Sequence, residues 1–140
     1  MTWEIRAFRA AETDAVVALW HAAGLTRPWN DPHRDIERKL SVQPELFLVA
    51  VHAGEIIGTV MAGYDGHRGW LYYLAVDPAR TGEGIGRALV AEAERLLLAM
   101  GCPKVQLMVR PDNAGARGFY EALGYERFET WNTGKRLIAD

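Results

Sequence analysis

LAVDPARTGEGIGRALV, residues 74–90, is the stretch that decides the fold of this 140-residue chain. It leads from the apolar run at 70–76 into an amphipathic helix that we predict over 84–100. Three glycines alternate at 82, 84 and 86, although one good capping residue would be enough to begin that helix. A helix N-terminus carries unpaired N–H groups and a partial positive charge, and glycines remove the Cβ atoms that would keep a ligand away from them. The segment therefore predicts a phosphate-binding turn.

The known nucleotide motifs do not fit this glycine turn. It has no Gly-Lys-Ser/Thr sequence, which excludes a P-loop. A dinucleotide fingerprint would place glycines at 82, 84 and 87, but residue 87 is arginine. The strands that we expect before the turn are antiparallel, unlike the opening of a dinucleotide-binding fold. A plain strand-to-helix turn would need only one glycine, so we favour a phosphate ligand of another class.

The sequence on both sides of the turn predicts a sheet with helices on its faces. Before the turn, strands are expected at 3–8, 46–51, 55–64 and 70–76, and helices at 13–23 and 32–42. After the turn and its helix, we expect a strand at 105–109, a helix at 113–123 and a terminal hairpin at 125–131 and 135–138. The order β-α-α-β-β-β-α-β-α-β-β indicates the α/β (α+β) class, with a central mixed, mostly antiparallel sheet in one domain over 1–140.

Composition narrows the classes of function. The net charge of −2 gives no electrostatic case for nucleic acid or an anionic membrane as partner. Cys102 is the only cysteine, which fits a reducing compartment, and the charged N-terminus does not read as a signal peptide. We therefore expect a soluble, cytoplasmic protein. His21 and His33 have no partner at metal-ligand spacing, so no metal site is expected.

Two segments together carry a family resemblance: residues 74–90 and NAGARGFYEALGY, 113–125. They resemble the pyrophosphate-binding and C-terminal motifs of the GNAT superfamily of acyl-CoA-dependent N-acyltransferases, and the element order agrees over nearly the whole chain. The turn departs from the family pattern at one position, where the glutamine or arginine of the motif is Thr81 and an arginine stands at Arg80. Donation from backbone N–H groups does not depend on that side chain.

The resemblance implies a donor site for acetyl-CoA as co-substrate. The pyrophosphate is expected on Thr81, Gly82, Glu83, Gly84, Ile85, Gly86 and Arg87. The pantetheine arm is expected to bind like an added strand along Leu74, Ala75 and Val76, and the strand at 105–109 is expected to splay away from it. Asn113 resembles a cofactor-contacting asparagine of the family, and it is equally placed to cap the helix that follows.

Tyr120 resembles the general acid of the family in its position. A phenol has a pKa of about 10, so it stays protonated at neutral pH and can donate to a leaving thiolate. The alternative is a core aromatic, because Tyr120 shares a helix face with Ala116 and Leu123. The general base stays open: Tyr72, Tyr73, Asp65 and His67 lie on or near the central strands, and the last two fit solvated turn residues better.

An amine acceptor is expected between the first two helices and the hairpins. The candidate residues for this site are Trp29, Asn30, Tyr64 and Tyr73. Trp29 also fits a core position, Asp31 fits a helix cap, and HRDIERK (33–39) fits a solvated helix face.

The resemblance thus implies an N-acetyltransferase that moves the acetyl group of acetyl-CoA to a primary amine. The amine could belong to a small metabolite, a peptide N-terminus or a lysine, and the length of the acyl group stays open. The alternatives are a noncatalytic acyl-CoA-binding sensor, for which Tyr120 would have no use, and a phosphate- or nucleotide-binding interaction module, which the missing nucleotide motifs disfavour. The expected partners are acetyl-CoA and an amine acceptor, with a homodimer as a further option, and neither nucleic acid nor a membrane.

Overall fold

One five-stranded sheet lies at the centre of the computed structural model, which describes residues 2–140. The strands follow one another in the order of the sequence: β1 (Glu4–Ala7), β2 (Phe47–His52), β3 (Glu55–Tyr64), β4 (Gly69–Val76) and β5 (Val105–Gln106). The first four strands are antiparallel neighbours, whereas β5 runs parallel to β4. The predicted mixed, mostly antiparallel sheet is therefore confirmed.

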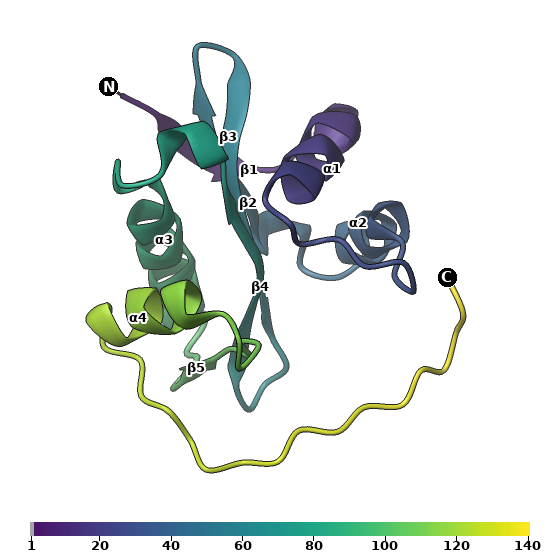
Figure 1. Cartoon of the computed structure of the whole chain (residues 1–140), viewed down its shortest axis with the longest axis vertical. Helices are drawn as coiled ribbons and strands as arrows, with labels where there is room; N and C mark the ends of the chain where they lie inside the picture. Colours follow the sequence, from purple (N-terminus) through teal and green to yellow (C-terminus); the bar gives the residue numbers. More distant parts are fainter. Residues whose placement is uncertain (1) are drawn as a thin grey trace.

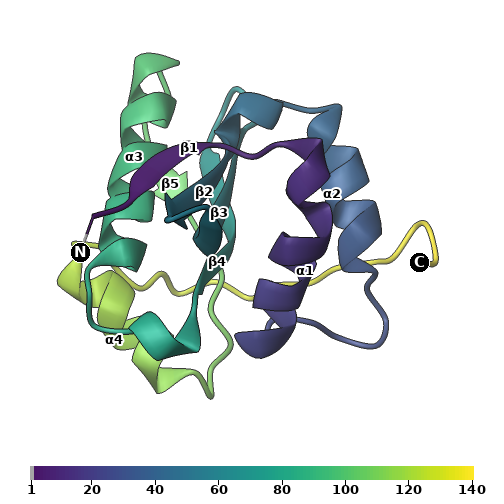
Figure 2. The same cartoon turned by 90° about the horizontal axis from the view of Figure 1, so that it is seen from above.

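Helices cover both faces of this sheet (Figures 1 and 2). On one face lie α1 (Thr13–Ala22) and α2 (Pro32–Leu40), and on the other lie α3 (Ile85–Ala99) and α4 (Ala114–Ala122). Short 3₁₀ turns at 10–12, 44–46 and 78–80 complete the regular structure. No helix within residues 2–140 is long and apolar enough to cross a membrane.

The central strands are apolar on both sides because helices cover both faces of the sheet. In β2, Leu48 packs in the buried cluster that includes α3, whereas Phe47 and Val49 pack in the cluster that includes Trp20 of α1. A strand alternates its side chains between faces, so one continuous apolar run contributes to two cores. Trp20 is fully buried in the second of these cores.

The end of the chain departs from the prediction. The terminal hairpin expected at 125–131 and 135–138 is not formed within residues 2–140, and the chain after α4 contains no helix or strand. This segment, residues 125–140, is called the C-terminal tail below. It leaves α4, runs clear of the sheet and reaches α2 on the far side (Figure 1). A strand needs a neighbouring edge to pair with, so an alternating pattern alone does not produce one.

Candidate functional site

The glycine turn lies between the end of β4 and the start of α3, as predicted. Gly82 has φ +83° and Gly84 has φ +87°, and this left-handed conformation favours glycine. Gly84 is the N-cap of α3 and supplies no side chain to its first N–H groups. Residues 81–84 are exposed. An exposed glycine loop therefore leads directly into the N-terminus of a 15-residue helix, where the helix dipole favours an anion.

Gly86 is required for a different reason than its two neighbours in the turn. It is buried in the first turn of α3, and a Cβ there would lie 3.3 Å from the ring of Phe119 in α4. Added Cβ atoms at Gly82 and Gly84 would meet nothing within 4 Å. Two glycines thus shape the loop, and the third lets α4 pack closely against the start of α3.

The edge of β4 next to the turn is open on one side. Ala75 and Val76 pair with Thr59 and Gly58 of β3. On the other side, β5 pairs with β4 only at the beginning of that strand, through Gly69 and Trp70. Within residues 2–140, the backbone at 74–76 therefore has no strand partner on the β5 side. The pairing between the two strands stops after Trp70 and Gln106, and β5 ends there, so the strand predicted at 105–109 is only two residues long.

Helix α4 packs Tyr120 against the buried cluster on the α3 face of the sheet. Asn113 caps the helix, because its side chain accepts from the backbone N–H of Ala116 at 3.0 Å. The ring of Tyr120 makes edge contacts with Phe119 and Tyr125 at centroid distances of 5.0 and 5.5 Å. Burial raises the pKa of Tyr120 to about 12, so the phenol stays protonated over the physiological range. Its hydroxyl makes no hydrogen bond to any residue in 2–140, which leaves the proton available to a ligand.

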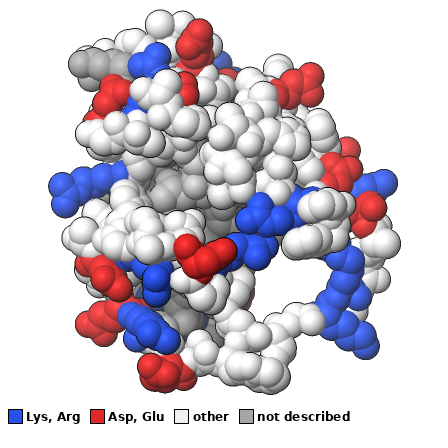
Figure 3. All heavy atoms as spheres, viewed as in Figure 1, with Lys and Arg blue, Asp and Glu red and all other residues white. Residues whose placement is uncertain are grey.

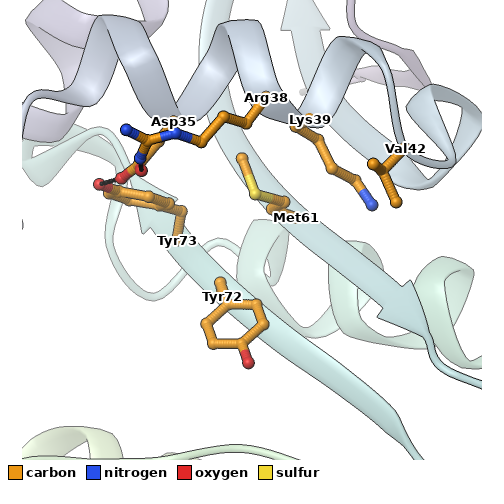
Figure 4. Close-up of a pocket in the computed structure, with 7 residues that line it drawn as sticks. All are labelled: Asp35, Arg38, Lys39, Val42, Met61, Tyr72 and Tyr73. Atoms are coloured by element: carbon orange, nitrogen blue, oxygen red, sulfur yellow. Dashed lines mark hydrogen bonds and ion pairs between the residues drawn. The ribbon is translucent and has the colours of Figure 1, made fainter. Parts of the chain in front are cut away.

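A polar cluster connects α2 to β4 on the opposite face of the sheet. The hydroxyl of Tyr73 donates to Asp35 Oδ2 at 2.6 Å, and Asn30 Nδ2 donates to the same oxygen at 2.6 Å. Arg38 donates to the other oxygen of Asp35 at 3.2 Å. Burial and the Asp35 carboxylate raise the pKa of Tyr73 well above its usual value, so it cannot serve as a base. Figure 4 shows Tyr73, Asp35 and Arg38 among the residues that line an open pocket of about 320 Å³.

The backbone at Tyr73 is held in an unusual conformation. Tyr73 has φ +52°, which is uncommon for a residue other than glycine, and it lies in a β-bulge where β4 has one more residue than β3. Thr59 Oγ1 donates to the carbonyl of Tyr73 at 2.8 Å and accepts from Trp20 Nε1 at 2.9 Å. The Trp20 ring stacks on the Tyr73 ring at 3.7 Å. The carbonyl and the ring of Tyr73 are thus both held in place, one residue before the open edge of β4 at 74–76.

The other predicted acceptor residues divide into two groups. Trp29 is 61% exposed beside Asn30, which excludes a core position for it. Tyr64 lies at the end of β3 against the cluster on the α3 face, so the structure does not bring it to Asn30 and Tyr73. Asp31 accepts from the N–H of His33 at 2.9 Å and caps α2, as expected.

Of the proposed base candidates, Asp65 and His67 form a turn. The Asp65 side chain accepts from the N–H groups of His67 and Arg68, both at 2.8 Å, and these bonds lower its pKa. Tyr72 lines the same pocket as Tyr73, but its ring stands apart from the Asp35 cluster in Figure 4.

Sequence reasoning missed the members of the site on α2, which are Asp35, Arg38 and Lys39. The helix face at 33–39 was expected to be solvated, yet Asp35 accepts from Tyr73, and Lys39 is buried and donates to the Ala62 carbonyl at 2.5 Å. Burial lowers the pKa of Lys39. The available signal was the position of Lys39 beside Ile36 and Leu40 on the apolar side of the helix. No group of three metal-ligating side chains occurs within residues 2–140.

Comparison with known proteins gives a consistent result. A profile of the acetyltransferase (GNAT) family matches residues 8–125. An acetyltransferase of Pectobacterium atrosepticum is 56% identical over 137 residues, which are 98% of this chain and 97% of that protein. An acetyltransferase of Yersinia enterocolitica is 53% identical with the same coverage.

Solved structures show the same fold. Ard1 from Thermoplasma volcanium is 25% identical, with a TM-score of 0.75 over 89% of this chain and 82% of that one. The aminoglycoside N-acetyltransferase AAC(6')-Iy, solved in complex with CoA, is 21% identical, with a TM-score of 0.80 over 98% of this chain and 96% of that one.

Proposed function

The chain belongs to the GNAT acetyltransferase family, and from this premise we propose that it is an N-acetyltransferase that moves the acetyl group of acetyl-CoA directly to a primary amine. The observation that carries the proposal is the combination of three features: the exposed glycine loop at 81–84 before α3, the edge of β4 at 74–76 that has no strand partner on the β5 side, and the hydroxyl of Tyr120, which makes no hydrogen bond within residues 2–140. Each suits a different part of an acyl-CoA thioester.

The donor is proposed to bind along the turn and the open edge. Its pyrophosphate would accept from backbone N–H groups of residues 82–87, where the helix dipole favours negative charge. Its pantetheine arm would pair with the backbone of 74–76 in the place of a neighbouring strand. This assignment needs no side chain from Thr81, which fits the departure from the family motif at that position.

The chemistry proposed for the site is direct acyl transfer. The nitrogen of a neutral amine attacks the thioester carbonyl carbon, the C–S bond breaks, and the new C–N bond forms an amide. Tyr120 gives its proton to the leaving thiolate, and the amine loses a proton to water. Burial raises the pKa of Tyr120 to about 12, so the phenol carries its proton at neutral pH, as the role of an acid requires.

The acceptor is proposed to enter between the loop before α2 and the bulge of β4. Trp29 is exposed there as an aromatic surface, and Asn30 is fixed by its bonds to Asp35 and Tyr73. The pocket beside Tyr73 provides room for the group that carries the amine. These features do not select among a small metabolite, a peptide N-terminus and a lysine.

The direct test is an amine-panel assay that follows release of free CoA thiol from acetyl-CoA. We expect turnover with one class of amine and formation of one acetyl-amide per thiol released, measured by mass spectrometry. Binding of acetyl-CoA with no amide from any amine would instead support the noncatalytic acyl-CoA sensor. Failure to bind acetyl-CoA would contradict both functions.

A further inference from the structure

A second pocket lies beside the one that Tyr73 and Asp35 line. It has a volume of about 550 Å³ and is formed between the loop before α2, α2 itself and the C-terminal tail. Trp29 lines it from the loop, and Lys135 and Arg136 line it from the tail. Arg38 lines both pockets, so the two meet at this side chain. Each has the size of a site for a small molecule.

The lining of the second pocket is cationic. Arg38, Lys135 and Arg136 carry positive charge, and no residue among 2–140 that lines this pocket is acidic. Arg38 also donates to Asp35, but a guanidinium has five N–H groups and this bond uses one of them. Figure 3 shows Lys and Arg side chains at the border of the opening between the tail and the rest of the molecule. A lining of this kind favours an anionic ligand group.

A carboxylate of the same chain shows which anion these cations accept. The side chain of Asp140 accepts from Arg38 at 2.5 Å and from the backbone N–H of Asp31 at 3.0 Å, and Arg136 lies 3.7 Å from it. This side chain is almost fully covered. Its contacts with Arg38 and Asp31 lower the pKa of Asp140, so it is ionised at neutral pH. Two guanidinium groups and one backbone N–H thus form a place for a carboxylate.

The first pocket leads from this place toward the proposed reaction site. Tyr73 lines the first pocket and lies one residue before the edge of β4 at 74–76, where the pantetheine arm is proposed to bind. Arg38 lines the same pocket. An acceptor with its amine beside Tyr73 can therefore place a second functional group against the guanidinium of Arg38.

We propose that the acceptor is a small molecule of the amino-acid type, with a carboxylate and a primary amine on the same carbon chain. The carboxylate binds Arg38 and Arg136 in place of the Asp140 side chain, and the apolar part of the acceptor packs on the exposed ring of Trp29. Replacement of one carboxylate by another leaves both guanidinium groups paired. The inference rests on the proposed acetyl transfer and names its class of substrate.

The first test measures binding without turnover. Calorimetry on the protein saturated with CoA uses glycine, β-alanine and γ-aminobutyrate, each beside its carboxamide. We expect at least one of these amino acids to bind, and Asp140→Asn to bind it at least about threefold more tightly, because the competing carboxylate is removed. The affinity for the carboxamide should not change. If none of the three binds to either protein, or if Asp140→Asn leaves the affinity for the amino acid unchanged, the inference is wrong.

The second test measures preference, defined as kcat/KM for an amino acid divided by kcat/KM for its carboxamide. Arg136→Gln should lower this ratio at least about tenfold, through a higher KM for the amino acid, because the carboxylate loses one charged partner. The pKa of the amine differs within a pair but is the same for every variant, so it cancels in the comparison. Arg95→Gln is the matched control, since Arg95 is exposed on α3 and pairs with Glu92, and it should keep the wild-type ratio.

The two tests separate this inference from the proposed function. Binding of an amino acid that Arg136→Gln weakens, with no acetyl-amide formed, would support the carboxylate site and contradict acetyl transfer. Turnover with a ratio that is the same in the wild type, Arg136→Gln and Arg95→Gln would support acetyl transfer and overturn the carboxylate site.

Discussion

Removal of one hydroxyl at Tyr73 tests whether the polar cluster holds α2 to the bulge of β4. Tyr73→Phe deletes the bond to Asp35 at 2.6 Å and the weaker bond that the hydroxyl accepts from Asn30 at 3.2 Å, and it keeps the ring that stacks on Trp20 at 3.7 Å. A hydrogen bond to a charged group contributes about 1.5–3 kcal/mol. Asp35 keeps its bonds from Asn30 and Arg38, so we expect a loss of about 1–2 kcal/mol in the free energy of unfolding. For a chain of this size, that lowers Tm by about 3–8 °C.

The assay for this prediction is thermal and urea unfolding of the variant beside a matched control. Tyr72→Phe is the control, because Tyr72 is the next residue of β4 and its hydroxyl makes no hydrogen bond within residues 2–140. A surface change of this kind should alter stability by less than about 0.5 kcal/mol. If Tyr73→Phe is as stable as Tyr72→Phe, the Asp35 cluster does not hold the two elements together and the reasoning fails.

Three further predictions concern the donor site, the acceptor site and pH. Gly84→Asp should weaken CoA binding at least tenfold, measured by calorimetry, because it sets a carboxylate against the pyrophosphate. The control is Gly54→Asp, which introduces similar backbone strain at a turn with φ +80° and should bind CoA normally. Trp29→Ala should raise KM for the amine with KM for acetyl-CoA unchanged, and equal changes in both would contradict its assignment to the acceptor side. Burial lowers the pKa of Lys39 on folding, so at pH values between the folded-state pKa and 10.5 the unfolded chain binds more protons than the folded one, and the free energy of unfolding should rise with pH. Lys39→Met should remove this pH dependence in urea titrations. If the pH dependence is unchanged in the variant, it belongs to other groups.

The sequence predicted the central sheet and the glycine turn because their signals are local. The continuous apolar run of β2, the hairpin that leads into β3, the glycines at 82 and 84, and the Asn113 cap each depend on neighbours within a few residues. Local reasoning did not show why residue 86 must be glycine, because the close neighbour that excludes a side chain there is Phe119 on another helix.

The parts that sequence reasoning missed depend on contacts between distant segments. Asp35 and Tyr73 are 38 positions apart, so no spacing rule connects them. The predicted terminal hairpin failed because alternation indicates which side chains share a face but not which edge they pair with. Tyr64 and Tyr73 were both expected at the acceptor site, but they pack in the clusters on opposite faces of the sheet.

The rate of Tyr120→Phe tests the proposed reaction most directly. The variant keeps the ring contacts to Phe119 and Tyr125 and loses only the hydroxyl, so folding and acetyl-CoA affinity should stay near wild type. Loss of a positioned general acid typically lowers the rate about 10²–10⁴-fold. We predict that loss in kcat with the preferred amine, because the proton moves at the transition state. In the wild type, kcat should hold across neutral pH and fall only as the pH approaches the Tyr120 pKa of about 12. A kcat for Tyr120→Phe close to the wild-type value would contradict the assignment of this hydroxyl as the acid.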